Sequence, residues 1–247
     1  MRVVFEGADV FKKSIKAIGK IVDEGVFVFD EEGMKLRSTD PSKIAMVDFL
    51  LPRHAFREYD VPEPVKVGLN IDDILNALKR AKSSEEVHMG LTEDGSRFII
   101  ELIGKARRRF VLPVLDVGGA ELPTPKLAFT ATAKVIAEVL QNAFKDADAF
   151  SSHVTLDVTS DAFTIKATGT KGEYVLELKR DVHDALLDLT VSEPARASYP
   201  LDYLQDMVGE VSKTAAVTVS LKTDAPLKLG YNIGDASFVY YLAPRIE

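Results

Sequence analysis

The four histidines, His54, His88, His153 and His183, are the first candidates for catalysis or metal binding, and their spacing favours neither. No two of them stand at the short intervals at which imidazoles from one helix or strand share a metal ion. The chain has no cysteine, which excludes thiolate zinc sites, iron–sulfur clusters, disulfides and cysteine nucleophiles. Phosphate-binding loops ending in Gly-Lys-Ser/Thr, Gly-x-Ser-x-Gly elbows and His-Glu-x-x-His motifs are also absent. We therefore expect no catalytic residues, no metal and no cofactor, and predict that the protein is not an enzyme.

Lysines form the clearest chemical pattern, and they indicate an anionic partner. A helix expected over residues 9–23 has an apolar stripe on one side of its helical wheel and only basic side chains on the other. The basic face consists of Lys12, Lys13, Lys16 and Lys20. Because solvated helices usually mix charges that pair along one face, four lysines without an acid favour a face suited to an anion. The alternative is an ordinary solvated surface.

Three more helices are expected, over residues 71–83, 134–148 and 201–212, and their basic character declines in that order. The second ends in Lys79-Arg80-Ala81-Lys82, a position where the helix dipole also favours cations. The third places Lys134, Gln141 and Lys145 opposite its apolar residues. The fourth carries mainly acids on its polar side, so it does not share the basic pattern.

These helices belong to a plan that occurs twice in the 247 residues. In each half a strand, a helix and a hairpin are followed by a second strand, a second helix and alternating strands. Each half therefore predicts two short helices among eight or nine strands. We expect an α+β protein with an N-terminal domain over 1–115, a glycine- and proline-rich linker over 116–126 and a C-terminal domain over 127–247.

The net charge of −7, from 31 basic and 38 acidic side chains, argues against a protein that coats nucleic acid over its whole surface. A groove or ring with its lysines on one face remains compatible with it. No apolar run approaches the roughly 18 residues that a membrane span requires. The chain starts on a strand-like segment rather than an apolar signal region, so we expect a cytoplasmic protein without membrane contact.

Several segments together resemble the archaeal members of the proliferating cell nuclear antigen (PCNA) family, the DNA sliding clamps. The resemblance runs over the whole length. The matching segments are Leu36-Arg37-Ser38-Thr39-Asp40-Pro41-Ser42, Tyr59-Asp60-Val61, Leu78-Lys79-Arg80-Ala81-Lys82, Pro113-Val114-Leu115-Asp116-Val117, and Ser198-Tyr199 with Tyr203-Leu204. The most specific is the C-terminal Tyr240-Tyr241-Leu242-Ala243-Pro244-Arg245-Ile246-Glu247, which follows the family's ending almost residue for residue.

This resemblance implies the duplicated DNA-clamp fold, two similar domains whose helices pack on antiparallel sheets, closed into a trimeric ring. Such a ring encircles duplex DNA without sequence preference and serves as a processivity factor. Its implied partners are the clamp-loader ATPase, DNA polymerase, flap endonuclease and DNA ligase, bound through short clamp-binding peptides. The implied location is the archaeal cytoplasm, in association with the nucleoid.

The resemblance also implies three sets of site residues. The DNA-facing set is Lys12, Lys13, Lys16, Lys20, Lys79, Arg80, Lys82 and Lys145. The partner-peptide pocket is Met46, Leu122, Pro226, Tyr241, Ala243 and Pro244, with Thr39, Lys43 and Ala120 at its edge. The subunit interface is Arg80, Lys82, Arg108, Val111, Asn142, Asp146, Val175 and Leu176, on strands expected over 107–115 and 173–180.

Two alternatives remain open at this stage. The chain could be one subunit of a heterotrimeric clamp, since some archaea build the ring from different chains. It could also be a monomeric scaffolding module with a solvated lysine face and no DNA inside it.

Overall fold

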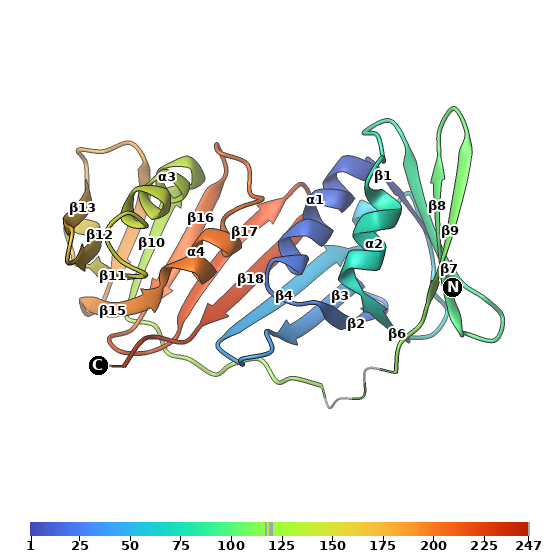
Figure 1. The fold of residues 1–247 in the computed structure, drawn as a ribbon, viewed down its shortest axis with the longest axis horizontal. Helices are drawn as coiled ribbons and strands as arrows, with labels where there is room; N and C mark the ends of the chain where they lie inside the picture. Colours follow the sequence, from blue (N-terminus) through green and yellow to red (C-terminus); the bar gives the residue numbers. More distant parts are fainter. Residues whose placement is uncertain (117, 119–120, 247) are drawn as a thin grey trace. The chain divides into compact units, whose positions relative to one another are not determined.

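In a computed structural model of the chain, residues 1–116, 118 and 121–246 are described (Figure 1). They form two compact units, each described by itself below. The first unit comprises Met1–Pro41, Val47–Leu122 and Ile233–Phe238, and the second comprises Ser42–Met46, Pro123–Asn232 and Val239–Glu247. No helix in the described part of the chain is long and apolar enough to cross a bilayer.

The first half of the chain contains two sheets. One has the strand order β5-β1-β7-β8-β9, and β4-β3-β2-β6 follow one another in the other. In chain order the elements are β1 (Arg2–Glu6), α1 (Ala8–Gly19), β2 (Glu24–Phe29), β3 (Gly33–Thr39), β4 (Ala45–Pro52), the 3₁₀ turn η1 (Arg53–Ala55), β5 (Glu58–Asp60), β6 (Val65–Asn70), α2 (Ile71–Leu78), β7 (Glu86–Leu91), β8 (Arg97–Ile103) and β9 (Arg107–Pro113).

The second half repeats this order. One sheet has the order β13-β12-β11-β15, and β14-β10-β16-β17-β18 follow one another in the other. The elements are β10 (Ala131–Ile136), α3 (Ala137–Ala147), β11 (His153–Val158), β12 (Ala162–Gly169), β13 (Gly172–Lys179), β14 (Leu186–Val191), β15 (Ala195–Pro200), α4 (Leu201–Met207), β16 (Ala216–Leu221), β17 (Leu227–Ile233) and β18 (Ala236–Leu242). The duplicated plan is confirmed, with nine strands and two helices per half among the described residues.

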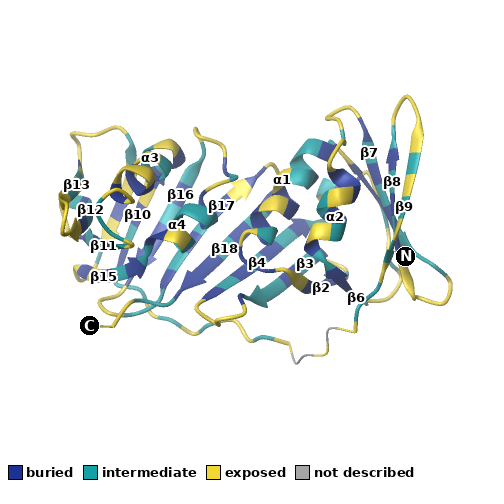
Figure 2. Ribbon diagram, in the orientation of Figure 1, coloured by how far each residue is buried: buried dark blue, intermediate teal, exposed yellow. Residues whose placement is uncertain are grey.

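Alternating side chains build the cores. Along β4, every second residue from Ala45 to Leu51 is buried, and β11 alternates in the same way. Because successive side chains of a strand point to opposite faces, one face of each sheet is apolar and the other meets solvent. The helices cover the apolar faces and turn their own polar sides outward, which Figure 2 shows as exposed residues along α1 to α4.

A side chain of one helix caps the end of its neighbour in both helix pairs. Lys12 Nζ in α1 donates to the carbonyl of Lys79, directly after α2, at 2.7 Å. Gln141 Nε2 in α3 donates to the carbonyl of Val208, directly after α4, at 2.8 Å. Both side chains are the fifth residue of their helix. They satisfy C-terminal carbonyls that have no partner within the helix.

The structure shortens all four expected helices. The third differs most, because Lys134, Val135 and Ile136 belong to β10, where Lys134 stands between Asp188 of β14 and Thr218 of β16. Pairing on both sides of this segment overrides its helical pattern, so Lys134 does not lie on α3. The strand that precedes α3 therefore runs from Ala131 to Ile136.

The observed faces of α2 and α3 differ from those of a simple helical wheel. In α2, Leu75 is only half-buried, whereas Ala77 is buried. In α3 the buried face includes Phe144 rather than the half-buried Val139. Gln141, expected on the solvated side of α3, is turned toward the end of α4 by its hydrogen bond. Packing between paired helices decides these positions, and a wheel drawn for one helix omits it.

Candidate nucleic-acid and partner-binding surfaces

The polar side of α1 carries three exposed lysines and one that is held by the fold. Lys13, Lys16 and Lys20 are exposed, and Phe11 and Ile15 on the opposite side are buried. Lys12 is only half-exposed because its ammonium group caps the Lys79 carbonyl. Of the four expected lysines, three are therefore exposed, and the fourth also joins α1 to α2.

The basic segment after α2 is shaped by an ion pair. Lys79, Arg80 and Lys82 are exposed. The buried Glu85 accepts hydrogen bonds from the Lys82 backbone N–H at 2.7 Å and from Arg108 Nη2 at 2.7 and 2.8 Å. These bonds, the backbone one first, hold the pKa of Glu85 below its usual range although burial acts in the opposite direction. Arg108 is thus neutralised within its own chain.

The outer side of α3 has mixed charge. Lys145, Asn142 and Asp146 are exposed, and the last two lie four residues apart on one helix face. Asp146 accepts a hydrogen bond from Tyr174 in β13; burial and the negative charge of Asp146 raise the pKa of that tyrosine. On α4, the exposed Asp202 bears out the acidic pattern read from the sequence.

Two sheet edges combine open backbone with exposed valines. β9 is the last strand of its sheet, paired with β8 on one side, and β13 is the last strand of its sheet, paired with β12. Val111 in β9 is 47% exposed and Val175 in β13 is 50% exposed. Leu176 beside it is half-buried. Figure 2 shows the exposed residues along both strands.

In the first unit, the end of the linker is fastened to the sheet by two basic residues. Arg37 Nη1 donates to the Leu122 carbonyl at 3.0 Å, and Lys66 Nζ contacts Glu121 Oε1 at 2.8 Å. The Leu122 side chain and Thr39 are half-buried. Ala120, also expected at the pocket, lies outside the described residues.

In the second unit, the C-terminal segment is held by the backbone on both sides of Pro244. Ala243 N–H donates to the Ile44 carbonyl at 2.9 Å, and Arg245 N–H donates to the Ser198 carbonyl at 2.7 Å. Tyr241 is buried and Pro244 is half-buried. Of the other residues expected at the pocket, Met46, Ala243 and Pro226 are half-buried and Lys43 is exposed.

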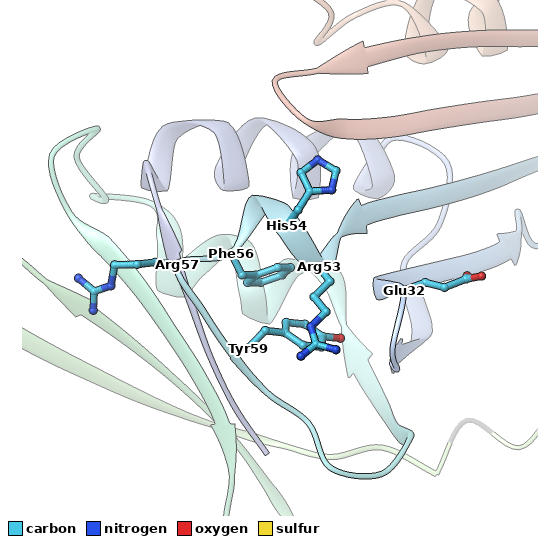
Figure 3. A pocket seen from close by; sticks show the side chains of 6 residues that line it. All are labelled: Glu32, Arg53, His54, Phe56, Arg57 and Tyr59. Atoms are coloured by element: carbon cyan, nitrogen blue, oxygen red, sulfur yellow. The ribbon is translucent and has the colours of Figure 1, made fainter.

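A further hollow of about 470 Å³ lies on the first unit (Figure 3). It is lined by Glu32, Arg53, His54, Phe56, Arg57 and Tyr59. Figure 3 shows Arg57 pointing away from the other side chains, and this residue pairs with Glu86. Arg53 lies over the Tyr59 ring, 5.7 Å from its centroid. Both arginines are thus engaged by the protein itself.

Three of the histidines make local contacts. His88 Nε2 is 2.8 Å from Glu86 Oε2, His183 Nδ1 accepts from the Lys179 N–H at 2.9 Å, and His153 Nδ1 is 3.0 Å from Ser152 Oγ. Within the described residues, no three His, Cys, Asp or Glu side chains converge as they would around a metal ion.

Sequence reasoning missed the role of Glu85, because an acid three residues after Lys82 reads as a solvated turn. The only sequence signal was its place between two basic segments, 79–82 and 105–109. It likewise missed the anchoring of the linker by Arg37, which joins residues 85 positions apart.

Comparison with known proteins places the chain in a family. Residues 1–112 match the model of the proliferating cell nuclear antigen N-terminal domain, and residues 124–246 match that of the C-terminal domain. A "DNA polymerase sliding clamp" from Thermofilum pendens is 37% identical over 250 residues, covering 100% of both chains.

Solved structures of similar chains agree with this. PCNA from Thermococcus kodakaraensis superposes with a TM-score of 0.94 at 29% identity and 99% coverage of each chain. A. fulgidus PCNA, solved with the C-terminal region of FEN-1 bound, has a TM-score of 0.90 at 26% identity, covering 100% of this chain and 98% of that one. The α+β clamp fold and the family resemblance expected from the sequence are confirmed.

The buried Glu85–Arg108 pair generates a prediction about stability. Glu85→Gln removes the charge from hydrogen bonds that contribute about 1.5–3 kcal/mol each when one partner is ionised, so we expect the free energy of unfolding to fall by about 2 kcal/mol at neutral pH. A carboxylate with a lowered pKa stabilises the fold above its ordinary pKa of 4.5, and this stabilisation is lost as the pH falls through the folded value. Urea denaturation should therefore show the difference between the two proteins shrinking as the pH falls below 4.5.

The control is Glu93→Gln, at an exposed turn position of the same unit. It should leave the unfolding midpoint unchanged at every pH. A Glu85→Gln protein as stable as the wild type at neutral pH would show that the ion pair does not hold the segment after α2.

Proposed function

The chain belongs to the proliferating cell nuclear antigen family, and from this premise we propose that it is a DNA sliding clamp in which three copies close into a ring. The ring encircles duplex DNA and tethers DNA polymerase and other replication and repair enzymes, acting as a processivity factor. The observation that carries the proposal is that two end strands, β9 and β13, expose Val111 and Val175 and belong to different units of one chain.

Two different edges suit a head-to-tail ring. A strand edge leaves backbone N–H and C=O groups unpaired, and a second strand can satisfy them. If β9 of one copy pairs with β13 of the next, each copy uses both edges, and the contact repeats until the ring closes. Val111 and Val175 then bury their exposed side chains against the neighbouring copy. Proposed ion pairs between Arg80 or Lys82 and Asp146 add orientation.

Arg108 has a narrower role in this interface than the sequence suggested. Its guanidinium already binds Glu85 through both carboxylate oxygens, so it positions the end of α2 rather than seeking Asp146 of a neighbour. Asn142, one turn from Asp146, stands where a relative can carry an acid. The proposed charge attraction therefore rests on fewer pairs than the count of basic residues indicates.

Charge placed on either edge should break the ring. Val111→Glu and Val175→Glu each bury a carboxylate without a partner in the proposed interface, which costs several kcal/mol. We expect light scattering to give about 81 kDa for the wild type, three times 27.1 kDa, and monomer for each variant.

The matched control is Leu187→Glu, because Leu187 in β14 is 47% exposed, as Val111 is, and lies outside the proposed interface. This variant should remain trimeric. Trimers from both valine variants would contradict the assigned edges. A wild-type monomer would favour the scaffolding module, and a wild type that assembles only with other clamp chains would favour the heterotrimeric alternative.

The lysines of α1 are proposed to line the hole of the ring. Lys13, Lys16 and Lys20 offer charge that attracts phosphates of any sequence, and water and salt weaken each contact enough for the ring to slide. The net charge of −7 keeps DNA away from the rest of the surface. Lys79, Arg80, Lys82 and Lys145 extend the same lining, whereas α4 contributes acids.

Removing the three exposed lysines should weaken DNA contact without unfolding the protein. The triple variant Lys13→Ala, Lys16→Ala, Lys20→Ala keeps Lys12, and with it the cap on α2. We expect shorter products in clamp-dependent primer extension, with the difference from the wild type largest at low salt, because a lining with fewer phosphate contacts depends less steeply on salt concentration.

A control of equal charge change is the triple variant Lys105→Ala, Lys126→Ala, Lys171→Ala, whose side chains are exposed outside the helices. It should match the wild type at every salt concentration. Equal product lengths for both triple variants would show that the α1 lysines are an ordinary solvated surface and do not contact DNA.

Partner enzymes are proposed to dock where the linker and the C-terminal segment offer apolar groups. Supporting this are the half-buried Leu122, Pro226 and Pro244, in segments that hydrogen bonds hold in place. The A. fulgidus structure supplies the ligand class, since that PCNA holds the C-terminal region of FEN-1. A peptide with aliphatic and aromatic anchors would bury those side chains in such a pocket. Met46, Tyr241, Ala243, Thr39, Lys43 and Ala120 complete the proposed site.

A peptide titration tests this pocket. Calorimetry with a synthetic peptide of the A. fulgidus FEN-1 C-terminal region should show at least tenfold weaker binding to Leu122→Ala and to Pro244→Ala. Both residues are half-buried, so truncation spares the core. Leu187→Ala serves as the control and should bind like the wild type. Equal affinity in all four proteins would mean that the peptide binds elsewhere.

The remaining parts of the proposal follow from the clamp function. The chain itself catalyses nothing; a clamp-loader ATPase opens and places the ring, and DNA ligase is a further peptide-bound partner. We propose that it works in the cytoplasm, at the nucleoid. The domain limits 1–115, 116–126 and 127–247 also stay predictions.

A further inference from the structure

A polar hollow of about 300 Å³ lies on the second unit, beside the C-terminal segment described above. It is formed by the open face of the sheet β13-β12-β11-β15 and by the C-terminal segment. Its lining residues are Ser151, His153, Thr155, Lys166, Thr168, Arg196, Ser198 and Arg245. They comprise three cations, one histidine and four hydroxyl groups, and no carboxylate.

Strand pairing fixes how these side chains converge. Thr155 of β11 stands between Lys166 of β12 and Ser198 of β15 in the register of the sheet, so the three side chains share one face. Arg245 is brought over this face from the C-terminus, because its N–H bonds the Ser198 carbonyl at 2.7 Å. The cradle is therefore built from three paired strands and a fastened segment rather than from one mobile loop.

The charges around the hollow leave two guanidinium groups available. Among the described residues, the Arg196 side chain makes no hydrogen bond or ion pair, and Arg245 contacts only His153 Nδ1, at 3.4 Å. Lys166 is partly neutralised by Glu173 at 2.8 Å. Asp157 faces Arg196 in the register but does not line the hollow.

The hydroxyl groups add donors. Thr155 and Ser198 share one bond at 2.7 Å, so one of their two protons is left to donate. Ser151 Oγ accepts from the His153 N–H at 3.2 Å and keeps its own proton free. Burial, and then the charge of Arg245, lower the pKa of His153, while Asp202 acts in the opposite direction. These effects favour the neutral form of the imidazole.

We propose that this hollow is a binding site for a phosphate group. Guanidinium forks and hydroxyl donors around one space match an oxyanion with several acceptor oxygens, and charged hydrogen bonds of this kind are the strong ones. The phosphate group can belong to free phosphate or to a phosphorylated side chain of a partner protein. All of its lining residues belong to one unit, so the site is complete in a single chain.

Equilibrium dialysis with radioactive orthophosphate tests the proposal on the full-length protein at constant ionic strength. We expect saturable binding of one phosphate per chain, and at least tenfold weaker binding by Arg196→Ala and by Arg245→Ala. Asp157→Asn, which removes the carboxylate facing Arg196, should bind more tightly. Lys179→Ala is the control, because Lys179 is an exposed cation on β13 of the same sheet, paired with Glu177. It should bind like the wild type.

Competition identifies the source of the phosphate group. N-acetyl-phosphoserine amide that displaces orthophosphate at tenfold lower concentration supports a phosphorylated partner, and weaker displacement than by orthophosphate itself supports the free ion. Acetate at the same concentration should not displace the bound orthophosphate. Absence of saturable binding, or equal weakening in Lys179→Ala and Arg196→Ala, would overturn the site. Thermal unfolding of each variant, expected to match the wild type, separates loss of binding from loss of fold.

Discussion

The burial of one face of each helix is the constraint on which the rest of this structure depends. Phe11, Ile15 and Ile18 are fully shielded from solvent, and removing them from water contributes about 1.5–3 kcal/mol each. Because α1 has only one apolar stripe, its burial is sufficient to turn Lys13 and Lys16 toward solvent. The surface that meets DNA in the proposed clamp is thus a consequence of core packing.

Both halves of the chain bury one face of each helix, but they use different side chains for the same contacts. In both halves the fifth residue of the first helix caps the end of the second, as lysine in one half and glutamine in the other. The capping geometry needs a donor that is long enough, and it does not need a charge. The cap therefore does not fix the charge of the polar faces. The segment after α2 is basic, and the outer side of α4 is acidic.

Electrostatics in this protein are arranged by pairing more than by composition. The Arg108 guanidinium is committed to Glu85 and Arg57 pairs with Glu86, so a count of basic residues overstates the charge that a partner meets. Exposed cations with a proposed role are those of α1, of the segment after α2, Lys145 of α3 and the two arginines of the hollow beside Arg245. A surface with few strong contacts suits a protein that holds DNA while moving along it.

The sequence by itself determined the duplicated plan, the apolar stripe of α1 and the basic face opposite, because helical and strand periodicities are local properties. It also carried the family resemblance, through segments such as the C-terminal Tyr241 to Pro244. Tertiary structure decided the rest. Lys134 lies on a strand because β14 and β16 flank it, Gln141 faces a neighbouring helix, and Glu85 is buried beneath Arg108. Each of these depends on a partner 23 to 84 residues away in the chain, and no local pattern records which distant segment will supply the hydrogen bond.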